Sequence, residues 1–116
     1  MTTQRSPITT HVLDTSLGRP AAGIAVTLSR MQNDAWQKIA EGKTDDDGRV
    51  STLLQPGTLT AGAYKIVFST ASYFEASKRS SFYPHVDIVF NVSAADEHYH
   101  VPLLLNPFGY STYRGS

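Results

Sequence analysis

Short apolar runs with a period of two constrain the fold of this chain more than any other feature. The runs lie at residues 9–14, 24–29, 36–42, 63–70, 86–92 and 98–105. Such alternation turns one face of a strand toward a core and the other toward solvent. Glycine, proline, asparagine and aspartate separate the runs at short intervals, as in turns. We therefore predict an all-β chain of seven to eight strands, folded as a two-sheet β-sandwich.

Three connections between these runs have recognisable turn or edge signals. Residues 24–42 are predicted to form a hairpin with NDAW as its turn. TDDDGRV (44–50) is predicted as a turn, because its Asp-Gly step allows positive φ at little cost, so that Arg49 begins the next strand. GYSTYRG (109–115) follows a predicted tight turn at Pro107 and Gly109. It is expected to be a final edge strand, antiparallel to its predecessor.

One segment breaks the strand period. TASYFEASKR (70–79) is rich in good helix formers, and Ser72 and Glu75 have the spacing of a capping box. We predict one short helix of about two turns there.

Length and charge exclude several classes of protein. The 116 residues suffice for one domain, residues 1–116, of which 1–7 are expected to be flexible. Ten basic and ten acidic residues give zero formal net charge, so nucleic acid and anionic lipid are poor partners. No apolar stretch has the length of a signal peptide core or a membrane span, which makes the cytoplasm the expected location. Near-zero charge also favours self-association.

The four histidines are candidates for general base chemistry, because only histidine has an ordinary pKa near neutrality. His11 shares a strand face with Thr9 and so points toward whatever that face lines. His98 and His100 share a face through the same period of two. His85, beside a proline in a loop, is assigned to structure or solvent. A lone histidine on a strand is more often a surface residue than a catalyst.

Zinc is a minority alternative for the same histidines. His98 and His100 could supply two ligands from one strand and His11 a third. The sequence has no cysteine and no obvious carboxylate to complete a closed site. We therefore predict no metal and no cofactor.

Other sequence motifs give no support for calcium binding, glycosylation, covalent serine hydrolysis or nucleotide binding. A calcium loop with Gly48 at its sixth position would need hard oxygen ligands at Lys43 and Leu54. The triplet Asn91-Val92-Ser93 fits a glycosylation signal but lies in a predicted strand. The sequence has no GxSxG elbow, P-loop or dinucleotide glycine fingerprint. Histidine, arginine and a terminal serine remain, a set that suits a reaction with water as nucleophile.

Three stretches resemble the transthyretin-like family: ITTHVLDTSLGRPAAGIAV, DDDGRV and HYHVPLLLNPFGYSTYRGS. The likeness runs over nearly the whole chain, and the closing YRGS is its most specific element, because the family uses it to tell its hydrolases from the hormone carrier. The resemblance implies two four-stranded sheets with one short helix. It also implies a homotetramer, a dimer of dimers, whose active sites lie in a channel at the dimer-dimer interface.

The resemblance further implies an activity and its residues. The reaction is hydrolysis of the ring of 5-hydroxyisourate to 2-oxo-4-hydroxy-4-carboxy-5-ureidoimidazoline in urate degradation. Histidine would activate water and arginine would hold the oxyanion. The implied catalytic residues are His11, Arg49, His100 and Ser116, and the implied substrate-binding residues are Tyr113, Arg114 and Gly115. Which histidine acts as the base is open.

The terminal residues have separate expected roles. Ser116 would bring a hydroxyl and the α-carboxylate to the site, and Gly115 would let the backbone approach closely. Tyr113 would bond the substrate, while Arg114 would pair with a carboxylate or help to position the tail.

The alternative is a transthyretin-like small-ligand carrier without catalysis. Transthyretin resembles this chain in fold but has lysine, glutamate and threonine where His11, Arg49 and His100 stand, and it lacks YRGS. Each of these differences removes a base or an oxyanion partner, so the sequence favours the enzyme.

Overall fold

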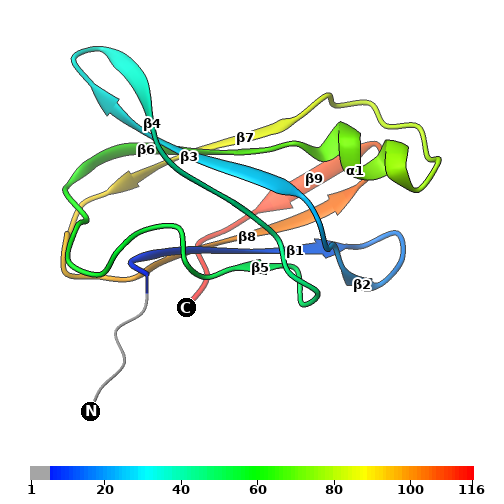
Figure 1. The fold of residues 1–116 in the computed structure, drawn as a ribbon, viewed down its shortest axis with the longest axis horizontal. Coiled ribbons are helices and arrows are strands. Elements are labelled where there is room, and N and C mark those ends of the chain that lie inside the picture. The colour runs from blue at the N-terminus through cyan, green and yellow to red at the C-terminus, as the bar shows by residue number, and fades with distance from the viewer. Residues whose placement is uncertain (1–5) are drawn as a thin grey trace.

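Two β-sheets face each other in the computed structural model, which describes residues 6–116 (Figure 1). The strands are β1 (Ile8–Asp14), β2 (Arg19–Pro20), β3 (Ala25–Gln32), β4 (Ala35–Lys43), β5 (Arg49–Val50), β6 (Gly62–Phe68), β7 (Val86–Val92), β8 (Tyr99–Asn106) and β9 (Gly109–Thr112). One helix, α1 (Thr70–Ala76), follows β6. The prediction of an all-β sandwich with one short helix is confirmed.

The first sheet has the order β2-β1-β8-β9, and β5 also pairs with β1. The second sheet has the order β4-β3-β6-β7. Only the second sheet has the four strands that the resemblance implies, because two short strands, β2 and β5, share one edge of β1. β5 pairs at Thr10 and His11, and β2 pairs at Leu13 and Asp14. Within the described residues, the pairing of β1 with β8 is parallel and all other strand pairs are antiparallel.

The core lies between the sheets and follows the period of two. On β1, Ile8, Thr10 and Val12 are buried, whereas His11 and Leu13 on the opposite face are partly exposed. On β8, the buried side chains of Tyr99, Val101, Leu103 and Leu105 alternate in the same way. The outer face of the first sheet therefore carries Thr9, His11 and His100. Polar side chains that the core excludes thus come together on one surface.

The predicted hairpin of residues 24–42 is formed by β3 and β4, which pair antiparallel. Its turn residues Asn33 and Asp34 have φ of 54° and 63°. Positive φ at both central positions is the requirement of a type I′ turn, whose twist matches that of the flanking strands. Asparagine and aspartate tolerate this conformation better than most residues.

Helix α1 begins three residues earlier than the capping box implied. Its N-cap is Ser69, which makes no side-chain capping hydrogen bond, so the predicted box at Ser72 and Glu75 is wrong. The amide of Ser69 instead donates to the Ala25 carbonyl. The backbone hydrogen bonds between β3 and β6 therefore continue up to the residue before the helix. Phe74 is buried and anchors α1 on the core. Within residues 6–116, no helix has the length and apolar character needed to cross a membrane.

A buried carboxylate fastens the end of β1 to α1 and the loop after it. The Asp14 side chain is fully buried and accepts hydrogen bonds from Ser16, Leu17, Tyr73 and Arg79. Burial raises the pKa of Asp14, but the hydrogen bonds from Arg79, Ser16 and Tyr73 outweigh it and lower the pKa to about 2. The carboxylate therefore stays charged at neutral pH and links three segments.

The start of the chain was predicted to be flexible over residues 1–7. Residues 1–5 lie outside the described residues. Ser6 is buried, donates to the Ile8 carbonyl and accepts from the Leu54 amide. The carbonyl of Pro7 accepts a hydrogen bond from the Tyr99 amide. The two described residues of this segment are thus bonded to the sheet and to a neighbouring loop.

Candidate active site

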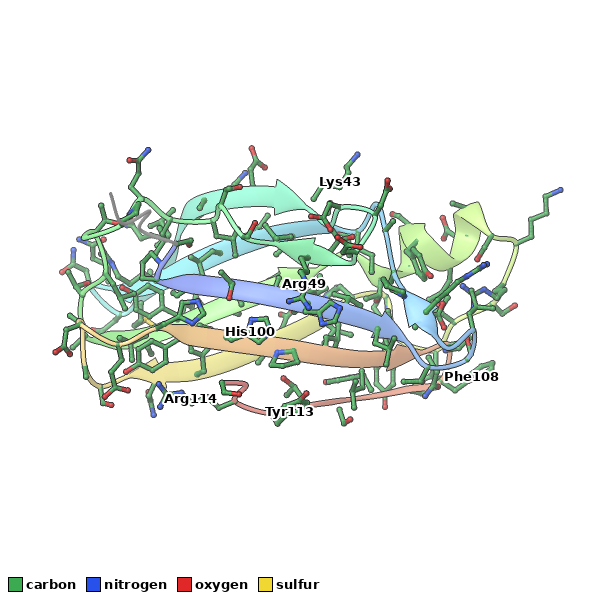
Figure 2. The ribbon with its side chains drawn as sticks, turned by 90° about the horizontal axis from the view of Figure 1, so that it is seen from below. Lys43, Arg49, His100, Phe108, Tyr113 and Arg114 are labelled. Atoms are coloured by element: carbon green, nitrogen blue, oxygen red, sulfur yellow. The ribbon has the colours of Figure 1, made fainter. Side chains whose placement is uncertain are left out.

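Three strands bring His11, Arg49 and His100, three of the four predicted catalytic residues, together on the outer face of the first sheet. His11 is the Cα partner of Arg49 across β1 and β5, and Thr9 is the partner of His100 across β1 and β8. Figure 2 looks onto this face and shows Arg49 and His100 near its middle. Tyr113 and Arg114 lie along the neighbouring edge, and Phe108 lies at the far end. Strand register, rather than closeness in sequence, therefore builds the site.

The turn before β5 determines the position of Arg49. Gly48 has φ of 75°, and a Cβ at this position would collide with the Val12 carbonyl. The Val12 amide donates to the Gly48 carbonyl at 2.8 Å, so the turn lies directly against β1. The Asp45 carboxylate accepts from the Arg49 amide at 3.0 Å. The Asp-Gly step predicted to make this turn thus also delivers Arg49 beside His11.

His11 is in an environment that favours its neutral form. Burial and the nearby Arg49 guanidinium lower the pKa of His11 below its ordinary value, while the Asp47 main chain and the carboxylates of Asp45 and Asp47 oppose this. A neutral imidazole at neutral pH has a lone pair that can accept a proton.

His100 is hydrogen-bonded by Thr9, a residue to which the sequence analysis assigned no function. The Thr9 hydroxyl lies 2.8 Å from His100 Nδ1 and 3.1 Å from His98 Nε2. The two rings are nearly parallel, with centroids 6.4 Å apart. The period of two already placed His98 beside His100 and Thr9 beside His11. The missing information was the parallel pairing of β1 with β8, which has no local sequence signal.

The last residues approach His100 from its other side. The Gly115 amide donates to the His100 carbonyl at 2.8 Å. A Cβ at Gly115 would lie 2.6 Å from His100 Cδ2 and 3.1 Å from Pro102 Cγ. No other residue type fits here without displacing the imidazole, which agrees with the close approach expected of Gly115.

The final strand is shorter than predicted. β9 ends at Thr112, although an isolated bridge between His100 and Gly115 continues its register with β8. The interruption falls where Pro102 stands opposite Tyr113, because proline has no amide hydrogen for the ladder. The Thr112 hydroxyl donates to the Pro102 carbonyl at 2.7 Å instead. The strand predicted over 109–115 is therefore broken in its second half.

A cavity of about 240 Å³ lies on this outer face. We call it the outer-face cavity; it is lined by Thr9, Thr10, Arg49, Val50, Ser51, His98, His100 and Ser116. Three of the four predicted catalytic residues thus share its wall. The fourth, His11, lies beside Arg49 on the same sheet face but is not part of that wall. Gly115 packs directly behind the imidazole of His100.

Two predicted substrate-binding residues, Tyr113 and Arg114, do not line the outer-face cavity. Tyr113 and Arg114 line a separate cavity of about 290 Å³ between β7 and the β8-β9 edge, which we call the edge cavity. Arg114 pairs with the Glu97 carboxylate at 2.9 Å, one of the alternatives predicted for it. Its guanidinium also lies 4.4 Å from the centre of the Tyr99 ring. Among residues 6–116, only His100 lines both cavities, so within one chain Tyr113 and Arg114 do not reach the outer-face cavity.

The remaining candidates are distributed as follows. His85 Nδ1 lies 2.6 Å from the Asp87 carboxylate, and its side chain is 55% exposed, so His85 belongs to the surface as predicted. Among residues 6–116, no three histidine, cysteine, aspartate or glutamate side chains are grouped so that they could hold a metal ion. The outer-face cavity offers imidazoles, a guanidinium and hydroxyls. These groups can transfer a proton and stabilise a developing negative charge.

Comparisons with known proteins agree with the observed fold. The model of the HIUase/Transthyretin family matches residues 8–115. A probable 5-hydroxyisourate hydrolase of Caenorhabditis elegans is 50% identical over 109 residues, covering 94% of this chain and 81% of the relative. The solved 5-hydroxyisourate hydrolase of Klebsiella pneumoniae superposes with a TM-score of 0.82 at 36% identity, covering 94% of this chain and 92% of that one.

The carrier branch is also similar in structure. Sea bream transthyretin in complex with thyroxine superposes with a TM-score of 0.89 at 32% identity, covering 94% of each chain. Similarity to both branches extends over nearly the whole sandwich, and the chain therefore belongs to the HIUase/Transthyretin family.

Proposed function

We propose that this protein is a 5-hydroxyisourate hydrolase, which opens the ring of its substrate to give 2-oxo-4-hydroxy-4-carboxy-5-ureidoimidazoline in urate degradation. The observation that carries the proposal is the convergence of Arg49, His100 and Ser116 on one cavity, with His11 beside Arg49. The C. elegans relative and the K. pneumoniae structure, both described as hydrolases of this substrate, support the choice of reaction.

In this proposal water is the nucleophile. A neutral imidazole of His11 or His100 takes a proton as the water oxygen bonds to the ring amide carbon. The carbonyl oxygen becomes an oxyanion, and the planar donor fork of Arg49 stabilises it. When the C–N bond breaks, the imidazolium returns the proton to the leaving nitrogen. The lowered pKa of His11 supports this role, because its ring is then neutral at neutral pH.

The C-terminal residues take supporting roles. Ser116 lines the outer-face cavity, where its hydroxyl would hydrogen-bond the substrate. Gly115 permits the close contact with His100. The ion pair with Glu97 supports a role for Arg114 in positioning the tail. Substrate binding by Tyr113 and Arg114 stays a prediction, since both line the edge cavity.

We further propose a homotetramer, a dimer of dimers, with the active sites at the dimer-dimer interface. The outer-face cavity is open on a sheet surface, and about 240 Å³ is below the roughly 300–1,000 Å³ of typical ligand pockets. A neighbouring subunit over this face would enclose it. The cytoplasmic location stays a prediction, which microscopy of a tagged chain can test.

The second candidate function is a small-ligand carrier. Its support is the superposition on sea bream transthyretin, whose structure contains thyroxine. Calorimetry distinguishes the two: a carrier binds thyroxine tightly and does not change 5-hydroxyisourate, whereas the hydrolase consumes it.

A spectrophotometric assay tests the enzyme. Urate oxidase generates 5-hydroxyisourate from urate, and the decay of its absorbance is followed with and without the protein. We expect His100→Ala to lower kcat by about 10²–10⁴, the usual contribution of a positioned acid or base. His85→Ala is the matched control, because it removes a surface imidazole paired only with Asp87 in the described contacts. Full activity of His100→Ala would contradict the assignment, and loss of activity with a chelator would favour a metal-dependent reaction.

A further inference from the structure

The geometry points to Thr9 as a positioning residue, which determines the nitrogen that His100 presents for proton transfer. The inference rests on the proposed function, because it gives His100 a proton-transfer role. It gives a role to Thr9, which lies in one of the stretches that resemble the family but is not among the residues to which the resemblance assigns a role.

The placement of Thr9 is the first argument. Thr9 is the register partner of His100 in the parallel β1-β8 pair, and its residue is only 9% exposed. Its hydroxyl lies between two imidazoles, 2.8 Å from His100 Nδ1 and 3.1 Å from His98 Nε2. A β-branched side chain on a strand has restricted χ1, so the hydroxyl is held in this place by the backbone.

The chemistry of a hydroxyl is the second argument. A threonine hydroxyl has one hydrogen, so it can donate to only one of the two rings and must accept from the other. A neutral imidazole likewise has one N–H. The two rings are therefore coupled: if His100 donates from Nδ1, the Thr9 hydroxyl donates to His98 Nε2. In the opposite direction Thr9 donates to His100 Nδ1, and His100 carries its hydrogen on Nε2.

The direction follows from the role of His100. As a base, His100 needs its lone pair on the nitrogen that does not face Thr9, which is Nε2. The Cδ2 atom bonded to Nε2 faces Gly115, next to the cavity-lining Ser116. We therefore assign the Nδ1–H tautomer to His100, with Thr9 as acceptor from His100 and donor to His98. A serine-protease aspartate holds its histidine in the same tautomer by a comparable bond to Nδ1.

Nitrogen-15 NMR of the imidazoles tests this assignment without substrate. At a pH where the rings are neutral, the wild type is expected to show His100 with hydrogen on Nδ1. Thr9→Val keeps the branched shape and removes the hydroxyl, and it is expected to shift His100 toward the Nε2–H form. Thr9→Ser restores the hydroxyl and is expected to restore the Nδ1–H form. A wild-type His100 with hydrogen on Nε2 would overturn the proposal, even if Thr9→Val failed to fold.

Kinetics supply the second readout. We expect Thr9→Val to lower kcat by roughly 10²-fold with little change in KM, because the base contribution is lost and binding is kept. Thr9→Ser is expected to recover most of kcat. Equal kcat for Thr9→Val and the wild type would overturn the proposal but leave the hydrolase function standing. A wild type without activity would instead reject the function, whatever the NMR shows.

The matched control is Thr44→Val. The Thr44 hydroxyl is buried, donates to the Ala21 carbonyl and accepts from the Ile24 amide, away from the outer-face cavity. Its loss is expected to lower the melting temperature without altering the His100 tautomer. A tautomer change in Thr44→Val as large as that in Thr9→Val would show a general effect of instability and would overturn the proposal.

Discussion

Gly115 and His100 are in direct contact at the residue scale. The glycine amide bonds the His100 carbonyl, and its Cα faces the Cδ2 edge of the ring. The imidazole is thus enclosed by Thr9 on one side and by main chain on the other. This contact permits a substitution at Gly115 that displaces the His100 ring, the proposed base, without removing any atom of the ring.

Gly115→Ala is expected to lower kcat strongly with a small change in stability. The new Cβ would lie 2.6 Å from His100 Cδ2, so the ring or the tail must shift. A displacement on the order of 1 Å costs about 10²-fold in rate. Steady-state kinetics and thermal melting of the same samples measure both effects. Gly109→Ala is the control, because its Cβ would meet only Asn106, at 3.7 Å. Equal rates for both variants would contradict the role of Gly115.

At the same scale, the sequence predicted the residue types better than their contacts. The family motifs named His11, Arg49, His100 and Ser116, and the structure brings three of them to one cavity with His11 alongside. They did not name Thr9, because its role depends on a strand partner 91 residues away. Local patterns contain no information on such a pairing.

At the scale of elements, the buried Asp14 carboxylate joins β1 to α1. Arg79 bonds it at 2.9 Å and also covers the Phe74 ring at 5.0 Å. Removing one partner of a buried pair leaves a desolvated charge behind. The ion pair therefore matters more for folding than the exposed pair of Lys38 and Glu41.

Arg79→Leu is expected to lower the free energy of unfolding by about 3 kcal/mol, near the lower limit for broken buried pairs because Arg79 is partly exposed. Leucine keeps an apolar side chain near Phe74, so the change reports mainly on the lost charge. Urea unfolding at neutral pH measures it. Lys38→Ala is the control and should cost less than about 1 kcal/mol. A loss no larger than that of the control would contradict the structural role of the pair.

The same variant has an expected pH signature. The wild-type Asp14 pKa falls from its ordinary 3.8 to about 2 on folding, which contributes about 2 kcal/mol of stability at neutral pH. That contribution is complete above about pH 4 and is lost as the pH falls toward 2. Arg79→Leu removes a cause of the low pKa, so its acid-unfolding midpoint should move to higher pH. An unchanged midpoint would contradict this sign.

The strands were predictable because their period of two is local, whereas their ends depend on distant residues. The ladder between β8 and β9 stops opposite Pro102, although the sequence 109–115 alone reads as one strand. Likewise α1 starts where Ser69 bonds Ala25 of the neighbouring strand, so the Ser72–Glu75 spacing had no influence on the start of the helix.

At the scale of the whole molecule, the proposed tetramer predicts that activity depends on concentration. If neighbouring subunits enclose the outer-face cavity, dilution should lower specific activity as the assembly dissociates. Analytical ultracentrifugation should then show a mass of four chains at high concentration and smaller species where activity falls. Circular dichroism over the same range controls for unfolding. Full specific activity of a monomer would reject the shared site.

The parallel pairing of β1 with β8 also determines when the site can exist. During translation, at about 5–20 residues per second, Thr9 precedes His100 by roughly 5–20 s because 91 residues separate them. The strands of the second sheet, β3, β4, β6 and β7, are all synthesised within that interval. A nascent chain can thus form one whole sheet while β1 still lacks its parallel partner β8. Hydrolase activity is therefore expected only after β8 has been synthesised and has paired with β1, which is a late step of folding.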